Sequence, residues 1–473
     1  MGELVRVCAR CGHVNPMDGP DRCRNCWSAL SGVAPVPRAE GERSPRFASL
    51  RKRRVLLPSL LVLAVGLTVW GVLVFFDLGP NPPTATTRAA AEVVRGVWSQ
   101  VGRTAENSGF SPEHIFVPRK IDWSYDTSEP LLAAPTVDEE RLYLTTQTGR
   151  ILALDRGSGE VVWQYDTGHH AGFPATATPA VAGELVIAPV RPGRVVGLHR
   201  RTREVVWETD IRAPLMASPI VVEGSVYVGA GDEMLYALDA ATGRERWTFH
   251  VLDRITAPVA YADDAVVVVN EESLVHIVDT NTGRKRFVYD AGAGSLGRNI
   301  RGGPAIHGEL AYFHTQGGTV WAVDRRTITY PFERAIAYWK TNFFLWGITS
   351  ELPVQKGTAW ITGLGGTLMH GPATAHDTVY AATVEGRVWA LDAGSGEVRW
   401  STQPGAGISS GVTVAGDTVV LGTEDGRLLG LNAHTGEQQW DFGLGGKISS
   451  RPVAVDGKLY LASEDGKVYA VSG

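Results

Sequence analysis

Residues Ala237–Trp247 read ALDAATGRERW, and this stretch decides the fold because the chain repeats it. A small residue and a leucine precede Asp239, a short Thr-Gly turn follows, and an aromatic residue stands eight positions after the aspartate. The same frame recurs as ALDRGSGEVVW from Ala153, ALDAGSGEVRW from Ala390 and GLNAHTGEQQW from Gly430.

Weaker copies lie between these four and make the spacing regular. They are GLHRRTREVVW from Gly197, IVDTNTGRKRF from Ile277 and AVDRRT from Ala322. The positions equivalent to the aspartate are Asp155, His199, Asp239, Asp279, Asp324, Asp392, Asn432 and, in a last partial copy, Ser472. Consecutive positions are 44, 40, 40, 45, 68, 40 and 40 residues apart. A period near 40 residues predicts propeller blades or another repeat array.

Each period has the pattern of short antiparallel strands. Ile220 to Gly229 and Met234 to Asp239 are apolar, β-branched or aromatic runs separated by Gly/Asp turns. Glu424-Asp425-Gly426 suits a tight hairpin in which glycine takes a positive φ. The Asp-x-x-Thr-Gly turn then leads into the strand that carries the tryptophan. Four strands per period predict an all-β propeller.

The spacing between the aromatic residue and the next aspartate position predicts how the ring closes. Several tryptophans precede the next such position by 32 residues, Trp207 and Asp239 being one pair. The eighth unit ends at Gly473 without a tryptophan strand of its own, and the residue 32 positions before Asp155 is Trp123. We therefore predict an eight-bladed propeller whose last blade is completed by residues 121–125.

The charge distribution separates the N-terminal region from the rest of the chain. The net charge is −5, but residues 1–54 carry 11 Lys/Arg against 5 Asp/Glu, so the remainder has 34 against 45. An acidic propeller argues against nucleic acid as its partner, because phosphate binding needs a basic face. All four cysteines precede residue 27, so the propeller contains no disulfide.

Cys8, Cys11, Cys23 and Cys26 form two C-x2-C pairs eleven residues apart. Four thiolates at this spacing predict one closed tetrahedral zinc site, which is structural because no coordination position is left for a substrate. A redox dithiol pair is the alternative, but no βαβ pattern surrounds either pair. The stretch CARCGHVNPMDGPDRCRNCWSAL resembles the small bacterial zinc-ribbon family, so residues 1–30 are expected to form a zinc ribbon.

The residues after the cysteines predict a membrane anchor. Residues 31–54 read as a basic flexible tether that ends in Arg51-Lys52-Arg53-Arg54, and residues 55–76 are uncharged and long enough to span a bilayer. Positive residues stay on the cytoplasmic side, so the N-terminus should be cytoplasmic and the propeller extracytoplasmic. A cleaved signal peptide is the alternative, but the apolar run is too long for one. A Pro/Thr-rich stalk, residues 77–97, should precede the propeller at 98–473.

The repeat A-x-D-x-x-T-G-x-x-x-W resembles the PQQ-type propeller repeat of quinoprotein dehydrogenases and of BamB-like proteins, over about residues 98–473. The segment from Trp98 to Pro112 also resembles the entry segment of these proteins. The resemblance implies that one aromatic residue per blade docks against a neighbouring blade. Here that role falls to Trp123, Trp163, Trp207, Trp247, Phe287, Trp400 and Trp440, with Phe332 as a weaker substitute in the remaining blade.

A PQQ enzyme would need loops that hold the cofactor, a Ca²⁺ ion and a carboxylate base. Apart from one insertion the blades are minimal, and the propeller lacks the adjacent cysteine pair that many enzymes of this family carry. PQQ is therefore not expected as a cofactor, and fold alone does not establish an activity. The adjacent pair His169-His170 lies in a Gly-rich connection, where a solvated loop is the default interpretation. We predict no catalytic residues.

The insertion at 330–372 is the one departure from the repeat. Its apolar residues Phe332, Ile336, Trp339, Phe343 and Trp346 fall at steps of 4, 3, 4 and 3, which predicts one stripe on a helix. We expect this stripe to pack on the side of the propeller, because large exposed apolar patches are rare on monomers. The alternative is a helix that docks a partner or the lipid interface.

Together these patterns predict a single-pass bacterial membrane protein. Its propeller would act as a non-catalytic scaffold, assembly factor or sensor that binds a protein or an envelope ligand on a propeller face. The alternative function is that of a membrane-bound PQQ-dependent oxidoreductase.

Overall fold

The computed structural model describes two parts of the chain. The described residues are 4–7, 14–19, 21, 22, 24, 27–37, 66, 69, 96–167, 177–190, 192–292, 299–329, 333–350 and 353–473. The chain divides into one compact unit from Met1 to Gly79 and a second from Pro80 to Gly473. Each unit is described by itself below.

The first unit contains a small sheet in the strand order β2-β1-β3. Its strands are β1 (Leu4–Val7), β2 (Val14–Pro16) and β3 (Val36–Pro37). The four cysteines predicted to bind zinc lie outside the described residues. Of the predicted membrane span, only Gly66 and Val69 are described, and both are helical. A search of the described part of the chain found no helix with the length and apolar character that a membrane crossing requires.

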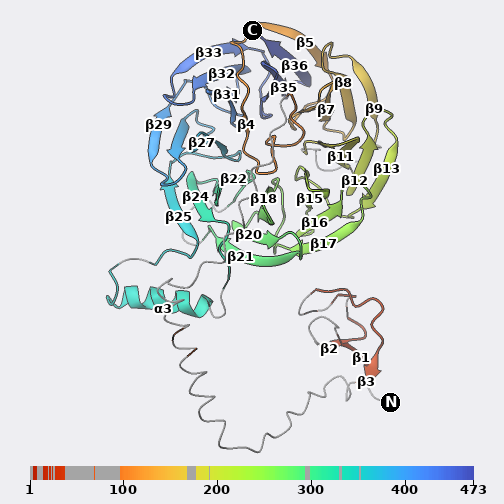
Figure 1. Cartoon of the computed structure of the whole chain (residues 1–473), viewed down its shortest axis with the longest axis vertical. Helices are drawn as coiled ribbons and strands as arrows, with labels where there is room; N and C mark the ends of the chain where they lie inside the picture. Colours follow the sequence, from red (N-terminus) through yellow and green to blue (C-terminus); the bar gives the residue numbers. More distant parts are fainter. Residues whose placement is uncertain are drawn as a thin grey trace, which may run out of the picture. The chain divides into compact units, whose positions relative to one another are not determined.

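The second unit is an eight-bladed propeller in the part that is described, and Figure 1 shows the blades arranged in a ring. Blade 1 consists of β6 (Thr136–Val137), β7 (Arg141–Thr145), β8 (Ile151–Asp155) and β9 (Val161–Tyr165). Blade 2 consists of β10 (Ala180–Ala182), β11 (Leu185–Val190), β12 (Arg194–His199) and β13 (Val205–Asp210). Blade 3 consists of β14 (Ile220–Val222), β15 (Ser225–Gly229), β16 (Met234–Asp239) and β17 (Glu245–His250). Blade 4 consists of β18 (Ala260–Ala262), β19 (Ala265–Val269), β20 (Leu274–Asp279) and β21 (Arg284–Asp290).

The second half of the ring continues in the same way. Blade 5 consists of β22 (Ala305–His307), β23 (Leu310–His314), β24 (Thr319–Asp324) and β25 (Thr358–Gly363). Blade 6 consists of β26 (Ala373–Ala375), β27 (Thr378–Ala382), β28 (Val388–Asp392) and β29 (Val398–Thr402). Blade 7 consists of β30 (Thr413–Ala415), β31 (Thr418–Gly422), β32 (Arg427–Asn432) and β33 (Gln438–Gly443), with β4 (Phe110–Ser111) added beside β30. Blade 8 consists of β34 (Val453–Val455), β35 (Lys458–Ala462), β36 (Lys467–Ser472) and β5 (Lys120–Asp126).

The ring is closed by the strand that the repeat spacing predicts. Strand β5, which contains residues 121–125, pairs antiparallel with β36, and Trp123 lies opposite Ala470. The pair is reinforced by Asp122, whose carboxylate accepts hydrogen bonds from Lys458 Nζ at 2.7 Å and Ser472 Oγ at 2.8 Å. The predicted eight blades and the closing strand are therefore confirmed.

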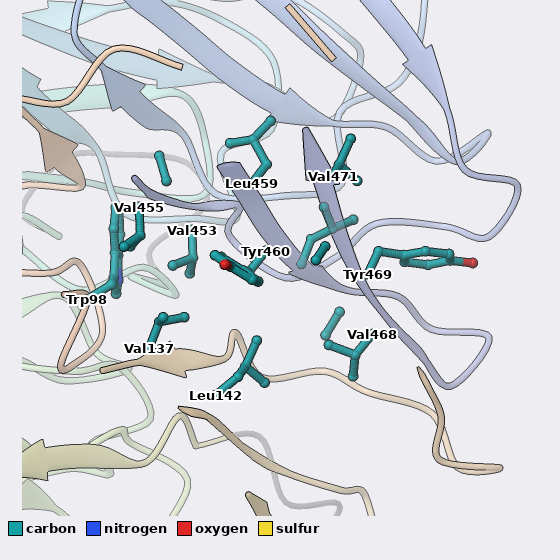
Figure 2. Close-up of a cluster of buried hydrophobic side chains, with 14 of the residues drawn as sticks. Trp98, Val137, Leu142, Val453, Val455, Leu459, Tyr460, Val468, Tyr469 and Val471 are labelled. Carbon is teal, nitrogen blue, oxygen red and sulfur yellow. The ribbon is translucent and has the colours of Figure 1, made fainter. Parts of the chain in front are cut away.

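The burial pattern explains why these strands form blades. The outermost strands have exposed and buried side chains: in β13, Val205 and Val206 are exposed and Trp207 is buried. The second strands of the blades are buried almost throughout. Figure 2 shows the core at the closing seam, where Trp98, Val137 and Tyr460 pack together and are at most 1% exposed. Each fully buried aliphatic or aromatic side chain of this kind contributes about 1.5–3 kcal/mol.

The entry segment, residues 96–113, runs past the innermost strand of one blade after another. Trp98 forms a β-bridge with Val137 in blade 1. The later contacts are Val181 N to Ser99 O (2.7 Å), Val221 N to Gln100 Oε1 (2.8 Å), Tyr261 N to Ala105 O (2.8 Å), Ile306 N to Glu106 O (2.9 Å), Thr374 N to Ser108 O (2.8 Å), Val414 N to Gly109 O (2.9 Å) and Asp456 N to Glu113 Oε2 (2.5 Å). The segment therefore ties all eight blades together near the axis, and β4 lies at the centre of the ring in Figure 1.

The insertion contains helix α3 (Glu333–Leu345), which lies outside the ring in Figure 1. The inserted material is shorter than the predicted 330–372, because β25 at Thr358–Gly363 is the outermost strand of blade 5. Its base is attached to the neighbouring blade, where Thr329 N donates to Arg286 O at 2.9 Å and Tyr289 Oη lies 2.8 Å from Thr358 Oγ1.

Candidate binding surfaces

The tryptophans on the outermost strands dock each blade onto the next. Trp207 is 7% exposed and donates its indole N–H to Ala240 O at 3.0 Å. In each case the acceptor is the carbonyl of the residue that follows the aspartate position. The other pairs are Trp123 to Arg156 (3.0 Å), Trp163 to Arg200 (2.8 Å), Trp247 to Thr280 (2.7 Å), Trp360 to Ala393 (2.8 Å) and Trp400 to Ala433 (2.9 Å). Phe287 and Trp440 are also buried, at 1% and 9% exposure.

Trp360 is the docking residue that the sequence interpretation missed. It stands on β25 opposite Ala322, at the position for which Phe332 was the expected substitute. Phe332 itself lies outside the described residues. The sequence contains a signal for it, since Trp360 precedes Asp392 by the same 32 residues that separate Trp207 from Asp239. Phe332 stands nearer the start of the insertion and does not have this spacing.

The Thr/Ser-Gly turn has a double requirement for glycine. Gly436 has φ +75°, a backbone conformation that side chains other than glycine rarely adopt. A Cβ there would also lie 2.5 Å from Trp400 Cε3, because the indole of the preceding blade covers the glycine. Gly159, Gly243, Gly283 and Gly396 are covered in the same way. The repeat therefore contains both partners of the contact between blades: the tryptophan of one blade and the glycine of the next.

The aspartates of the repeat organise this turn and are not free to bind a ligand. Asp392 Oδ1 accepts hydrogen bonds from Ser395 N at 2.8 Å and Gly394 N at 3.0 Å, and its Oδ2 pairs with Arg399 at 2.7 Å. The Arg399 hydrogen bond, followed by those from Ser395, lowers the pKa of Asp392 to about 2. Recurrence of the aspartate is thus explained by turn hydrogen bonding.

Helix α3 carries the candidate partner-docking residues on an exposed surface. Trp339 and Trp346 are 48% and 59% exposed, while Ile336 and Phe343 are partly buried. The rings of Trp339, Phe343 and Trp346 lie 6.0–6.2 Å from one another, so they form one aromatic cluster. For Trp339 and Trp346, the expectation that the stripe packs on the propeller's side is therefore wrong. Their neighbours Tyr338, Leu345 and Ile348 are even more exposed, at 63%, 69% and 64%.

Several histidines lie in the interior of the ring and are kept neutral. His370 Nε2 lies 2.8 Å from Ser409 O, and burial, with the charge of Arg451 adding to it, lowers the pKa of His370 to about 4. His314 Nε2 contacts His370 O at 2.6 Å, and burial lowers its pKa as well. The pair His169-His170 lies outside the described residues. No group of three or more His, Cys, Asp or Glu in the described part of the chain is arranged to hold a metal ion.

A pocket of about 670 Å³ lies at the seam between blades 8 and 1. Its polar residues are largely engaged with one another: Arg156 donates to Asp456 Oδ2 at 2.5 Å, to Tyr460 Oη at 3.1 Å and to Gly96 O at 3.1 Å. This network connects the last blade to the first, so the pocket is part of the contact that closes the ring.

The geometry described above defines a class of protein: an eight-bladed propeller of the PQQ-like type, with tryptophan-docked blades and an entry segment that binds every inner strand. The family model for "outer membrane protein assembly factor BamB" matches residues 118–220, 199–327 and 353–473. The chain therefore belongs to this BamB-type family of PQQ-like propellers.

Solved structures show the same fold at low sequence identity. The BamB structure from Moraxella catarrhalis has a TM-score of 0.59 at 18% identity, covering 75% of this chain and 97% of that one. Quinohemoprotein alcohol dehydrogenase ADHIIG from Pseudomonas putida HK5 has a TM-score of 0.61 at 17% identity, with 80% of each chain covered. A europium-containing methanol dehydrogenase has a TM-score of 0.62 at 14% identity, covering 80% of this chain and 98% of that one.

One curated relative shares more sequence over a shorter stretch. It is the serine/threonine-protein kinase AfsK of Streptomyces griseus, 35% identical over 117 residues, which make up 24% of this chain. The match spans 14% of that kinase. Similarity to an assembly factor, to dehydrogenases and to part of a kinase shows that one fold serves several roles.

Proposed function

We propose that this chain is a membrane-anchored, extracytoplasmic binding protein that acts without catalysis as a scaffold, assembly factor or sensor. The uncharged run at 55–76 would anchor it, the cysteines Cys8, Cys11, Cys23 and Cys26 would bind a structural zinc ion on the cytoplasmic side, and the propeller would present its loops to a ligand or partner outside. The observation that carries the proposal is the exposed aromatic cluster on α3.

The partner at α3 is, in our proposal, a protein with an apolar groove. Ile336, Trp339, Phe343 and Trp346 have the i, i+3, i+7 spacing with which a helix is anchored in such a groove. Tryptophan and tyrosine are enriched among residues that dominate interface energies. A helix that lies on lipid usually has a Lys/Arg-rich polar face, whereas the sequence of α3 contains only Arg334 and Lys340, offset by Glu333.

Site-specific photocrosslinking in native membranes tests this role. A photoreactive residue in place of Trp346 in the full chain should form a protein adduct, and Trp339→Ser should reduce that adduct at least tenfold. The matched control is a photoreactive residue at Ile361, which is 47% exposed on β25 of the same blade and should give no such adduct. Adducts with lipid only, or equal protein adducts from both positions, would contradict a protein partner at α3.

Titration with PQQ and Ca²⁺, followed by absorbance, tests the absence of catalysis. We expect no saturable spectral change. Tight binding of one PQQ per chain would instead support the oxidoreductase.

A further inference from the structure

The residue two positions before each innermost strand occupies an equivalent place in every blade, and blade 8 is unlike the other seven. In the described blades these residues are Ala134, Thr178, Ser218, Pro258, Gly303, Gly371, Gly411 and Arg451. Seven of them are small or compact, and the eighth is an arginine. Blade 8 therefore has a long cationic side chain where the other blades have small or compact residues.

The contacts of Arg451 place its guanidinium between blades and beneath the entry segment. Its Nη2 contacts Gly371 O, the equivalent residue of blade 6, at 3.4 Å. A Cβ on Gly411, the equivalent residue of blade 7, would lie 3.0 Å from Arg451 Nε, and a Cβ on Gly109 would overlap Nη1. A side chain that meets two other blades and the entry segment lies close to the axis. Because Gly371, Gly411 and Gly109 have no side chains, there is space for the side chain of Arg451.

Within the described part of the propeller, no carboxylate neutralises the positive charge of Arg451. Its Nη1 is inaccessible to solvent and has no hydrogen-bond partner, and no ion pair joins this residue to a carboxylate in the described part of the propeller. Burial alone lowers the pKa of Arg451 to about 10, so the guanidinium is still charged at neutral pH. The propeller segments 168–176, 191 and 293–298, which lie outside the described residues, contain no Asp or Glu.

Other buried arginines of this propeller show what a neutralised charge looks like. Arg103 pairs with Glu113 at 3.2 Å and with Ser111 Oγ at 2.6 Å, and Arg156 pairs with Asp456 at 2.5 Å. A buried charge without such a partner costs several kcal/mol. An anion that bound the guanidinium would recover much of this cost, because hydrogen bonds between ionised groups are the strong ones.

The surroundings of Arg451 favour an anion with oxygen acceptors. The Oγ of Ser449, two residues before Arg451, is buried without a hydrogen-bond partner. Lys447 lies in the same connection, although its Nζ pairs with Glu464 at 3.2 Å. His314 and His370 line the same region and stay neutral, with their Nε2 atoms on carbonyl oxygens. Part of the Arg451 residue remains accessible to solvent.

We propose that Arg451 anchors an axial binding site for a small oxyanion. The ligand would be a carboxylate or phosphate group whose oxygens accept hydrogen bonds from the guanidinium group. The inference rests on the binding role proposed above and names the chemical class of ligand that the propeller would bind at this position. Planar guanidinium groups are suited to paired recognition of carboxylate and phosphate oxygens.

Phosphate and acetate are the probes that test the site. The full chain in detergent is unfolded thermally in chloride buffers of constant ionic strength while inorganic phosphate replaces chloride, and acetate is used in a parallel series. We expect a saturable rise in Tm with one of the two anions, because a ligand that binds only the folded state stabilises it. The effective anion identifies which oxyanion chemistry the site prefers. No saturable rise with either anion would overturn the proposal.

Two variants separate the site from general salt effects. Arg451→Gly and Arg451→Ser introduce the residues of equivalent positions 411 and 218, so the fold should tolerate them. Both should abolish the saturable rise and weaken binding of the effective anion in equilibrium dialysis more than tenfold, while the non-saturating effect of salt remains. Arg212→Gly, at an exposed arginine paired with Asp210, should leave binding unchanged. A saturable rise that persists in both Arg451 variants would overturn the proposal.

The outcome is distinguishable from failure of the proposed function. If PQQ with Ca²⁺ binds stoichiometrically and phosphate binding still requires Arg451, the non-catalytic role fails and the oxyanion site stands. If the Arg451 variants bind the anion as the wild type does but the α3 adduct forms, the oxyanion site is ruled out and the docking role is supported.

Discussion

At the scale of single residues, the same side-chain hydrogen bonds recur in the turn of each repeat, with small substitutions between blades. Asp392 uses one oxygen for the turn and the other for Arg399. Asn432 keeps the first function, since its Oδ1 accepts from His434 N at 2.9 Å and Thr435 N at 3.0 Å, but it cannot form the ion pair. The turn hydrogen bonds can therefore form without the ion pair. Only the ion pair requires an ionised carboxylate, so its contribution to stability depends on pH.

We predict that Asp392→Asn makes the stability of blade 6 less dependent on acid. The folded-state pKa of Asp392, about 2, is below the usual value of an aspartate. Such a group stabilises the fold above about pH 4, and this stabilisation is lost as the pH falls toward about 2. The variant should unfold at lower urea concentration than the wild type at pH 6, and the difference should shrink below about pH 4 and be largely gone near pH 2.

Arg399→Gln is the matched control for this prediction, because it removes the same ion pair from the other side. It should give the same convergence of unfolding midpoints at low pH. A midpoint difference that stays constant from pH 6 to pH 3 would show that the turn, and not the charge, accounts for the effect.

At the scale of elements, the outermost strands join the blades, while helix α3 of the insertion lies outside the ring. Trp360 on β25 follows the insertion directly and still reaches Ala393 O in the next blade. The insertion therefore leaves the blade contact intact. In the described part of the insertion, the hydrogen bonds of Thr329 and Thr358 attach it to the neighbouring blade near its two ends, and the aromatic cluster of α3 is exposed.

We predict that Trp360→Phe lowers the free energy of unfolding by about 0.5–1.5 kcal/mol, the worth of one hydrogen bond. Ala393 O keeps a second donor, Tyr312 Oη at 3.0 Å, so no carbonyl is left unpaired. Trp360→Ala should cost about 3–5 kcal/mol, because it also leaves a cavity. Urea unfolding followed by far-UV circular dichroism measures both.

Phe287, the natural phenylalanine at the equivalent position of blade 4, provides the reference for the Trp360 variants. Replacing Phe287 with Ala should resemble Trp360→Ala. Equal losses for Trp360→Phe and Trp360→Ala would mean that the hydrogen bond, and not ring packing, holds blades 5 and 6 together.

At the scale of the whole molecule, two segments from the start of the propeller act on the complete ring. Strand β5 completes blade 8, and the entry segment binds the inner side of every blade. Both join residues more than 300 positions apart, as in the contact of Asp456 N with Glu113. The ring is thus formed only when the last blade has been made.

We predict that deletion of residues 119–126 lowers the Tm of the propeller by about 10 °C or more. The deletion removes β5, its pairing with β36 and the buried Trp123, losses that together exceed about 5 kcal/mol, and each kcal/mol shifts the Tm of a large domain by about 2 °C. Differential scanning calorimetry of the full chain measures the change.

Deletion of the same number of residues from α3, 335–342, is the control. These residues are mostly exposed and lie outside the blades, so the propeller's Tm should change little. If both deletions have the same effect, ring closure by β5 contributes no special stability.

Much of the architecture follows from local patterns. The 40-residue period, the 32-residue spacing and the alternation of strands predict eight blades and the closing strand, because every blade repeats the same short-range turn and pairing chemistry. The same spacing contains the position of Trp360, and the sequence interpretation overlooked it only because an insertion intervened. The turn aspartates were likewise assigned to architecture from sequence.

The sequence by itself determined the number of blades and the strand that closes them, since these depend on residues at regular separations, and the docking role of the tryptophans followed from the resemblance to PQQ-type repeats. Only the tertiary structure decided where the interruptions point: α3 away from the ring, the entry segment around its axis, and Arg451 between Gly371 and Gly109. Exposure and charge pairing arise between residues of different blades. No periodicity within one blade can therefore reveal that the arginine of the eighth blade reaches two other blades and has no ion pair among the described residues of the propeller.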